Sequence, residues 1–309
     1  MMKVWKAILF LWWEVSGMNK LLSAGFYKMC RSKIFRICLL FSAGYPLFQM
    51  TLRLIERTFY YPVSEPVDTF TILDLMFLGI VLAAFVSLYL GREYSDGVIR
   101  NKLIIGHSRM SIYLANLLTV TLGAFLMHGI FFLAMFLLGR LYGLPMELSF
   151  GELAPAALLG FLFIIAYASI FTMVSMLTAS GSVGPVVALI IAFFLMIMGI
   201  SIYSALSDMY AEIPPELLAD PGFHPLASRP KWQQVLFPLL YNALPSSQAM
   251  QLMDYVAYAG AAKAGHLSTV VIEPTTFPLL AGTSALYDLL IAALTTAIGI
   301  LLFRRKDLN

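Results

Sequence analysis

Six long runs of uncharged residues constrain this 309-residue chain more than any other feature. Each run is close to the roughly 20 apolar residues that a helix needs to cross a bilayer. Only 12% of the residues are charged and the mean hydropathy is +0.84, whereas a soluble domain carries about 25% charged residues. The sequence therefore predicts an all-α, polytopic membrane protein with six transmembrane helices, at about residues 34–50, 72–90, 111–138, 153–177, 185–206 and 285–303.

The basic residues predict the orientation of these helices. With both termini in the cytoplasm, 14 of the 20 Lys and Arg residues fall on the inner side, as the positive-inside rule requires. We therefore expect a multi-pass protein of the plasma or inner membrane, with a cytoplasmic N-terminus at 1–33 and a cytoplasmic tail at 304–309. The formal net charge of +3 gives no reason to expect nucleic acid as a partner.

Residues 18–33, just before the first span, have the pattern of an amphipathic helix. Leu22, Phe26 and Met29 fall within one narrow arc. Such a helix is expected to lie along the inner membrane surface, in contact with the lipid bilayer. The basic residues expected on its opposite face are Lys20, Lys28 and Arg31.

The first 17 residues have a separate interpretation. The codons of Trp13, Glu14 and Val15 can contain a sequence that resembles a ribosome-binding site, shortly before the codon of Met18. We therefore expect translation to begin at Met18. An intact-mass measurement of the native product tests this expectation.

The segment 207–284 is the longest non-spanning stretch, and the orientation places it outside the cell. It holds nine of the 15 prolines, which favour loops and turns. Pro245, Ser246 and Ser247 have the pattern of a helix start. The sequence therefore predicts a short amphipathic helix outside the membrane, beginning at Pro245.

The loop at 91–110, between the second and third spans, carries the most informative motif. Asp96 can cap a short helix that runs to about Ile104, Gly106 can end it, and Ser108 can cap the next span. A short helix that mixes charge with apolar residues suits docking into a groove of a soluble partner. The apolar residues are Val98, Ile99 and Leu103.

This loop resembles the type-2 permeases of ATP-binding cassette (ABC) exporters. The six spans at 34–303, the basic N-terminal helix and the extended external segment extend the resemblance over nearly the whole chain. The resemblance implies that two permease subunits, as a homodimer or a related pair, form the translocation pathway. It also implies that residues 92–104 are a coupling helix that contacts the ATPase subunits. The matching residues are Glu93, Tyr94, Asp96, Gly97, Ile99, Arg100, Asn101, Lys102, Gly106, Ser108 and Arg109, with Val98 standing where a Thr is frequent.

The resemblance also implies a division of chemistry between chains. The sequence contains no G-x-x-x-x-G-K-[ST] loop to hold phosphates, so ATP and Mg²⁺ are expected on a partner ATPase subunit, and this chain is expected to be neither an enzyme nor a cofactor-binding protein. The expected cargo is a small amphipathic, peptide or drug-like molecule, moved outward. An ATP-independent secondary carrier or a membrane scaffold is the alternative, although the midplane ion ligands of a carrier are not evident.

Three charged residues of the loop each have two possible interpretations. Glu93 is either an anchor at the membrane end of the coupling segment or a solvated loop carboxylate. Arg100 and Lys102 either pair with acidic residues of the ATPase or hold the loop near anionic lipid.

Ionisable residues within spans are functional candidates by default. Counting along the helices places His128 and Asp288 near the outer leaflet. They can line an exit pathway or bind a cationic group of the substrate. The alternative is that they form an interfacial pair or lie in a water-exposed site. The same alternative applies to Asp74, at the outer end of its span. The four His residues are scattered, so no metal site is expected, and Cys30 and Cys38 do not suggest a disulfide framework.

Overall fold

A computed structural model describes residues 2–59, 66–211, 230–265 and 277–306. These residues form α-helices and one short 3₁₀-helix, with no strand among them. The helices are α1 (Met2–Arg31), α2 (Lys33–Phe59), η1 (Asp68–Ile72), α3 (Asp74–Ser95), α4 (Val98–Ile104), α5 (Arg109–Leu141), α6 (Phe150–Thr178), α7 (Val183–Ala211), α9 (Lys231–Ala243), α10 (Pro245–Ala264) and α11 (Phe277–Arg305).

Six of these helices are long and apolar enough to cross a membrane, and they fall on the six predicted runs. They are α2, α3 with η1, α5, α6, α7 and α11. Each extends past its uncharged run; in α5 and α11, helical structure includes the flanking basic residues Arg109 and Arg304. The chain is therefore a multi-pass membrane protein, as the sequence predicted.

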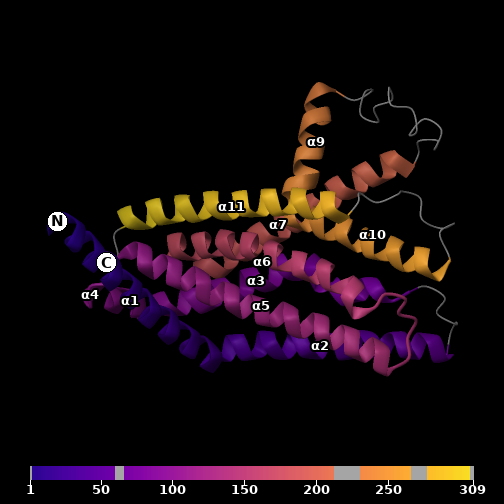
Figure 1. Cartoon of the computed structure of the whole chain (residues 1–309), viewed down its shortest axis with the longest axis horizontal. Coiled ribbons are helices and arrows are strands. Elements are labelled where there is room, and N and C mark those ends of the chain that lie inside the picture. Colours follow the sequence, from indigo (N-terminus) through magenta and orange to yellow (C-terminus); the bar gives the residue numbers. More distant parts are fainter. Residues whose placement is uncertain (1, 60–65, 212–229, 266–276, 307–309) are drawn as a thin grey trace.

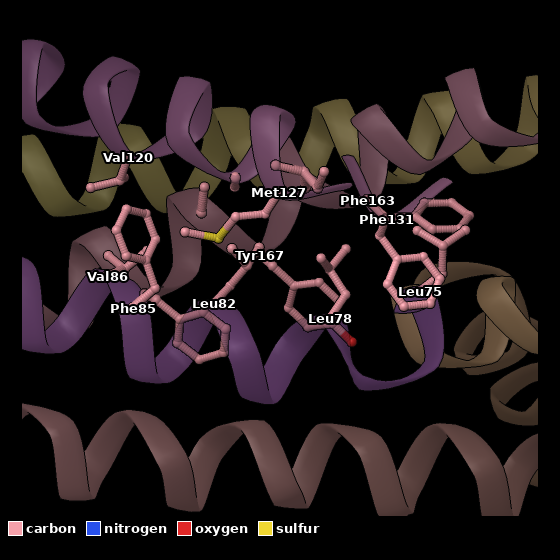
Figure 2. Packing of buried hydrophobic residues seen from close by; sticks show 14 of the residues in the cluster. Leu75, Leu78, Leu82, Phe85, Val86, Val120, Met127, Phe131, Phe163 and Tyr167 are labelled. Atoms are coloured by element: carbon pink, nitrogen blue, oxygen red, sulfur yellow. The ribbon is translucent and has the colours of Figure 1, made fainter. Parts of the chain in front are cut away.

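The interior of the bundle is formed by α3, α5 and α6, whereas α2, α7 and α11 are more exposed. In Figure 2, Leu78 and Leu82 of α3 lie among Met127 of α5 and Tyr167 of α6. Because lipid is as apolar as these side chains, close packing rather than exclusion from water holds such helices together.

The bundle has two ends with different contents (Figure 1). At one end lie α4, the start of α5 and the last turn of α11, and Arg109 Nη1 of α5 donates to the Phe303 carbonyl oxygen of α11 at 2.8 Å. We call this the α4 end. At the opposite end α3 begins, and α10 packs against the bundle; we call this the α10 end.

The helix predicted to begin at Pro245 is confirmed as α10, with Pro245 in its first turn. It does not stand clear of the spans, as a helix outside the membrane would. Residues 245–249 are all buried, and Ser246 Oγ donates to the Leu195 carbonyl oxygen of α7 at 2.8 Å. Small polar side chains permit this insertion because they can bond to the backbone of a neighbouring helix. Pro214, Pro215, Pro221 and Pro225 lie outside the described residues.

The helix predicted at residues 18–33 is also present, as part of the longer α1. Within the predicted apolar arc, Met29 is buried and Phe26 is 39% exposed, while Leu21, outside the arc, is also buried. The reason is that α1 packs against α5, so protein contacts select its inner face. Lys20 and Arg31 are exposed, as expected. The position of α1 at a membrane surface stays a prediction.

Candidate functional site

The short helix α4 is built by a tight turn after α3. The Asp96 N–H donates to the Arg92 carbonyl oxygen at 2.9 Å, so Asp96 ends α3. Gly97 follows with a φ of 67°, and it occupies the N-cap of α4. The prediction that Asp96 caps the short helix is therefore wrong. A left-handed residue was needed to reverse the chain, and glycine adopts that conformation without steric cost.

The other predicted boundaries of the loop are confirmed. Gly106 has a φ of 101° just after α4 ends. Ser108 caps α5, where its Oγ accepts a hydrogen bond from the Ser111 N–H at 3.0 Å. The loop is thus fixed at both ends by glycine turns and a side-chain cap.

Glu93 lies at the centre of a buried charge network. Its carboxylate accepts hydrogen bonds from Lys102 Nζ at 2.8 Å and from Lys28 Nζ at 3.4 Å. Lys102 Nζ also donates to Asn116 Oδ1 at 3.1 Å. The Glu93 side chain is only 1% exposed, so the reading of a solvated loop carboxylate is wrong. The Glu93 carboxylate of α3 instead joins α1 and α4, and Lys102 extends the network to α5.

Further contacts fix the same end of the bundle. The Tyr94 hydroxyl donates to the Met176 carbonyl oxygen of α6 at 2.9 Å. Lys306 follows the last turn of α11, and its Nζ bonds to the Leu177 carbonyl oxygen. Burial lowers the pKa of the Lys306 ammonium group, because a low-dielectric environment disfavours the charged form. The ends of α3, α6 and α11 are therefore held together behind α4.

The outward face of α4 differs from the one expected. Ile99 is buried, and Leu103 is half-buried against the core. The Lys102 ammonium is engaged within the chain, so it is not free to pair with an acidic partner. These residues turn inward because α4 closes over the ends of α3 and α5. Among the residues that α4 and its flanks do expose are Asp96, Arg100, Asn101, Ile104 and Ile105.

Ile104 and Ile105 are the residues that the sequence reasoning missed. They are 75% and 77% exposed, next to a glycine turn and two polar residues. The signal was available, since two β-branched apolar residues at the end of a short polar helix cannot both face inward. We call the five exposed residues at 96, 100, 101, 104 and 105 the α4 surface. It combines an exposed apolar pair with three polar residues, a mixture that suits a protein-binding patch.

His128, near the α10 end, is buried rather than water-exposed. Its Nδ1 lies 2.6 Å from Asp74 Oδ2, and its Nε2 lies 3.0 Å from the Ala157 carbonyl oxygen. His128 therefore pairs with Asp74, a partner that the sequence analysis did not name. The expectation of water exposure is wrong because α3, α5 and α6 close around the imidazole.

Asp288 is not part of that pair. It is fully buried on α11, and neither of its carboxyl oxygens has a hydrogen bond within the described residues. The Gln248 side chain lies nearby, but its Nε2 donates to the Asn242 carbonyl oxygen at 2.6 Å. The structure therefore does not bring His128 and Asp288 together, since Asp74 is the partner of His128.

Residue types that would indicate other chemistry are not grouped here. Across the described parts of the chain, no three His, Cys, Asp or Glu side chains are placed to hold a metal ion. Cys30 is exposed and Cys38 half-buried, and both are free thiols.

These features describe a helical membrane protein in which the partly apolar α4 surface is anchored at one end of the bundle. The sequence model of the ABC-2 family transporter protein matches residues 21–199, which include α2 through most of α7 and the whole of α4. The match covers more than half of the chain, which therefore belongs to this family of membrane transport proteins. No curated protein matches the sequence.

Proposed function

We propose that this chain is the permease subunit of an ABC exporter, and that the α4 surface is where a separate ATPase subunit docks. The observation that carries the proposal is the exposed pair Ile104 and Ile105 on a helix whose base is locked by the Glu93 network. In water, such a pair is favourably covered by an apolar groove of a partner.

The charge distribution supports a cytoplasmic position for this surface. Arg92, Arg100, Lys102 and Arg109 cluster around α4, and Arg304 and Arg305 end α11 at the same end. An excess of basic residues marks the cytoplasmic side of membrane proteins. We infer that both termini lie on that side, where ATP is available to a partner.

The buried network supports a transmitting role for α4. A force applied to α4 reaches α3 and α5 through Lys102, which bonds to Glu93 and Asn116. It reaches α6 through Tyr94. Because salt bridges and packed helix ends resist bending, α4 moves with the spans rather than independently of them. ATP and Mg²⁺ would bind to the partner, and their turnover would reach the spans through these contacts.

Two parts of the proposal rest on the family and on composition. A second permease subunit, most simply another copy of this chain, would complete the pathway and bring a second ATPase. The cargo would be a small amphipathic, peptide or drug-like molecule, in keeping with the apolar and aromatic lining that 23 Phe and 17 Met residues can provide.

A co-purification experiment tests the docking proposal. The tagged full chain is extracted from its native membrane in mild detergent, and bound proteins are identified by mass spectrometry. We expect an ABC-type ATPase with the unchanged chain, and its loss when Ile104→Asp and Ile105→Asp are combined, because two carboxylates would enter an apolar groove.

A matched control separates docking from general damage. Leu141, at the end of α5 away from α4, is 77% exposed, as Ile105 is. Leu141→Asp makes the same chemical change at the same exposure and should leave the ATPase bound. Retention of the ATPase by the double aspartate variant, or its absence from every sample, would contradict the proposal.

A further inference from the structure

A cavity of about 320 Å³ lies between α2, α3 and α5, well away from the α4 surface. Its volume is at the lower end of the range for sites that hold small molecules. It lies toward the α10 end, because Asp74 at the start of α3 forms part of its wall. The lining residues are Phe41, Ser42, Tyr45, Asp74, Phe77, Leu78, Ile80, Val81, Leu82, Met127, His128 and Phe131.

The walls of this cavity are apolar and rich in aromatic rings. Tyr45 and Phe131 lie with their ring centroids 6.1 Å apart and nearly parallel, and Phe41 lies 5.7 Å from Tyr45. Figure 2 shows Leu78 and Leu82 on the α3 side. Such walls accept a compact apolar body without leaving polar groups unpaired.

The cavity is open to the outside of the bundle. Phe41 on α2 is 54% exposed and Phe77 on α3 is 40% exposed, so both stand at its rim. Ser42, Leu82 and Met127 are buried and form its floor. A molecule dissolved in the surrounding lipid can therefore enter between α2 and α3.

The polar corner of the cavity holds two protons and no net charge. The 2.6 Å contact between His128 Nδ1 and Asp74 Oδ2 requires one proton between the two atoms. The contact between Nε2 and the Ala157 carbonyl oxygen requires another on Nε2. A carboxylate and an imidazole with two protons sum to zero charge, so the pair does not demand an ion as its neighbour.

One acceptor in this corner has no partner. Asp74 Oδ1 is a buried atom without a hydrogen bond among the described residues, although Asp74 lines the cavity. A buried acceptor that lacks a donor costs free energy. The corner is therefore complementary to a ligand that brings a donor to Oδ1.

We propose that this cavity binds a compact, mostly apolar molecule with one hydrogen-bond donor, a hydroxyl or amide N–H, which donates to Asp74 Oδ1. The apolar body fills the space between Tyr45, Leu82 and Phe131. Two sources supply this chemistry, a membrane lipid and an amphipathic cargo. The inference does not depend on the export proposal, because a ligand can bind here whether or not an ATPase docks at α4.

A photolabelling experiment tests the site with two probes. The purified full chain in lipid nanodiscs is labelled with a 1-octanol that carries a diazirine and with the matching diazirine-octane that lacks the hydroxyl. Labelled peptides are mapped by mass spectrometry and normalised to the peptide that carries the exposed residues Ile190 and Phe194 of α7. We expect the hydroxyl probe to label peptides of α2, α3 and α5 about fivefold more than the alkane, as one hydrogen bond provides. Excess unlabelled 1-octanol should abolish this difference.

Two variants and one control locate the binding. Ser42→Phe fills the floor and should remove cavity labelling by both probes. Asp74→Ala should remove only the advantage of the hydroxyl probe, provided that its thermal unfolding shows a folded protein. Ile190→Phe adds a similar ring at a 64% exposed position of α7 and should change neither. Equal labelling by the two probes, or unchanged labelling in Ser42→Phe, would overturn the proposal.

The source of the natural ligand is decided by extraction. Protein from native membranes is extracted with organic solvent, and the molecules retained by the unchanged chain are compared with those retained by Ser42→Phe. A phospholipid or fatty-acyl species lost in the variant identifies a lipid site. A non-lipid amphiphile lost in the variant identifies a cargo site, and this outcome links the cavity to transport.

Discussion

The two ends of the bundle differ in how completely their buried carboxyl groups are hydrogen-bonded. At the α4 end, Glu93 is matched by Lys102 and Lys28 at hydrogen-bonding distance. At the α10 end, Asp288 has no hydrogen bond within the described residues, and Asp74 keeps one oxygen free. A fully bonded network makes an end rigid, whereas unmatched acceptors leave an end able to gain by binding or rearranging. The α4 end is therefore suited to transmitting force, and the α10 end is suited to responding to a ligand.

The largest expected effect concerns the matched end. Glu93→Ala leaves the Lys102 ammonium, 15% exposed, without its carboxylate. Removing one partner of a buried ion pair costs about 3–5 kcal/mol, so the thermal unfolding midpoint in detergent should fall by many degrees. Combining Glu93→Ala with Lys102→Met should recover much of the loss, since no buried charge then remains unpaired.

An exposed pair is the control for this prediction. Arg53 and Glu56 of α2 form a 2.8 Å ion pair whose side chains are 31% and 50% exposed. Glu56→Gln should cost no more than about 0.5 kcal/mol. If Glu93→Ala is as mild as Glu56→Gln, the α4 end is not held by its charges.

The second prediction compares packing within a single helix. A methyl group at Gly299 of α11 would lie 2.2 Å from the Tyr113 hydroxyl, whereas one at Gly282 meets no atom within 4 Å. Gly299→Ala should therefore destabilise the protein by about 1–3 kcal/mol. Gly282→Ala should be neutral or slightly stabilising, because it only reduces the freedom of the unfolded chain. Equal midpoints for the two variants would show that the α4 end is no more tightly packed than the α10 end.

The third and smallest effect has the opposite sign. Asp288→Asn removes a buried unmatched carboxylate, and the new amide can donate to Gln248 Oε1, which also lacks a hydrogen bond. We expect a gain of about 1–2 kcal/mol in unfolding free energy. Glu152→Gln, in an exposed ion pair with Lys263, is the control and should change little. A loss of stability in Asp288→Asn would mean that the carboxylate has a partner in the membrane.

Much of the fold could be predicted from the sequence, because a helix that crosses lipid needs a long uncharged run. The six spans follow from this requirement. The start of α10 was marked by Pro245, but its insertion into the bundle was not, since amphipathicity does not tell a protein surface from a lipid surface. The same ambiguity applies to α1, where Leu21 and Met29 are buried against the protein and Phe26 is exposed.

The candidate site was predicted in position but not in detail. The motif around Gly97 located α4, because glycine and polar residues between two apolar runs require a turn. The partners of Glu93 come from α1 and α4, and Lys102 bonds onward to Asn116 of α5; such distant pairings follow only from how the helices pack. For the same reason Ile99, expected among the docking residues, is buried, and the exposure of Ile104 was not predicted. Asp74 and His128 are 54 positions apart, and nothing local in the sequence indicates that they meet.

The most direct test of the central claim is a photocrosslink from the α4 surface. A benzoylphenylalanine replaces Ile105 in the full chain, expressed with the ABC-type ATPase that co-purifies with it, and Leu141 carries the same replacement as a control. A crosslink to the ATPase from position 105 and none from position 141 is the predicted result. A crosslink from position 141 alone, or labelling of position 105 by a reagent confined to the outside of the cell, would contradict the account.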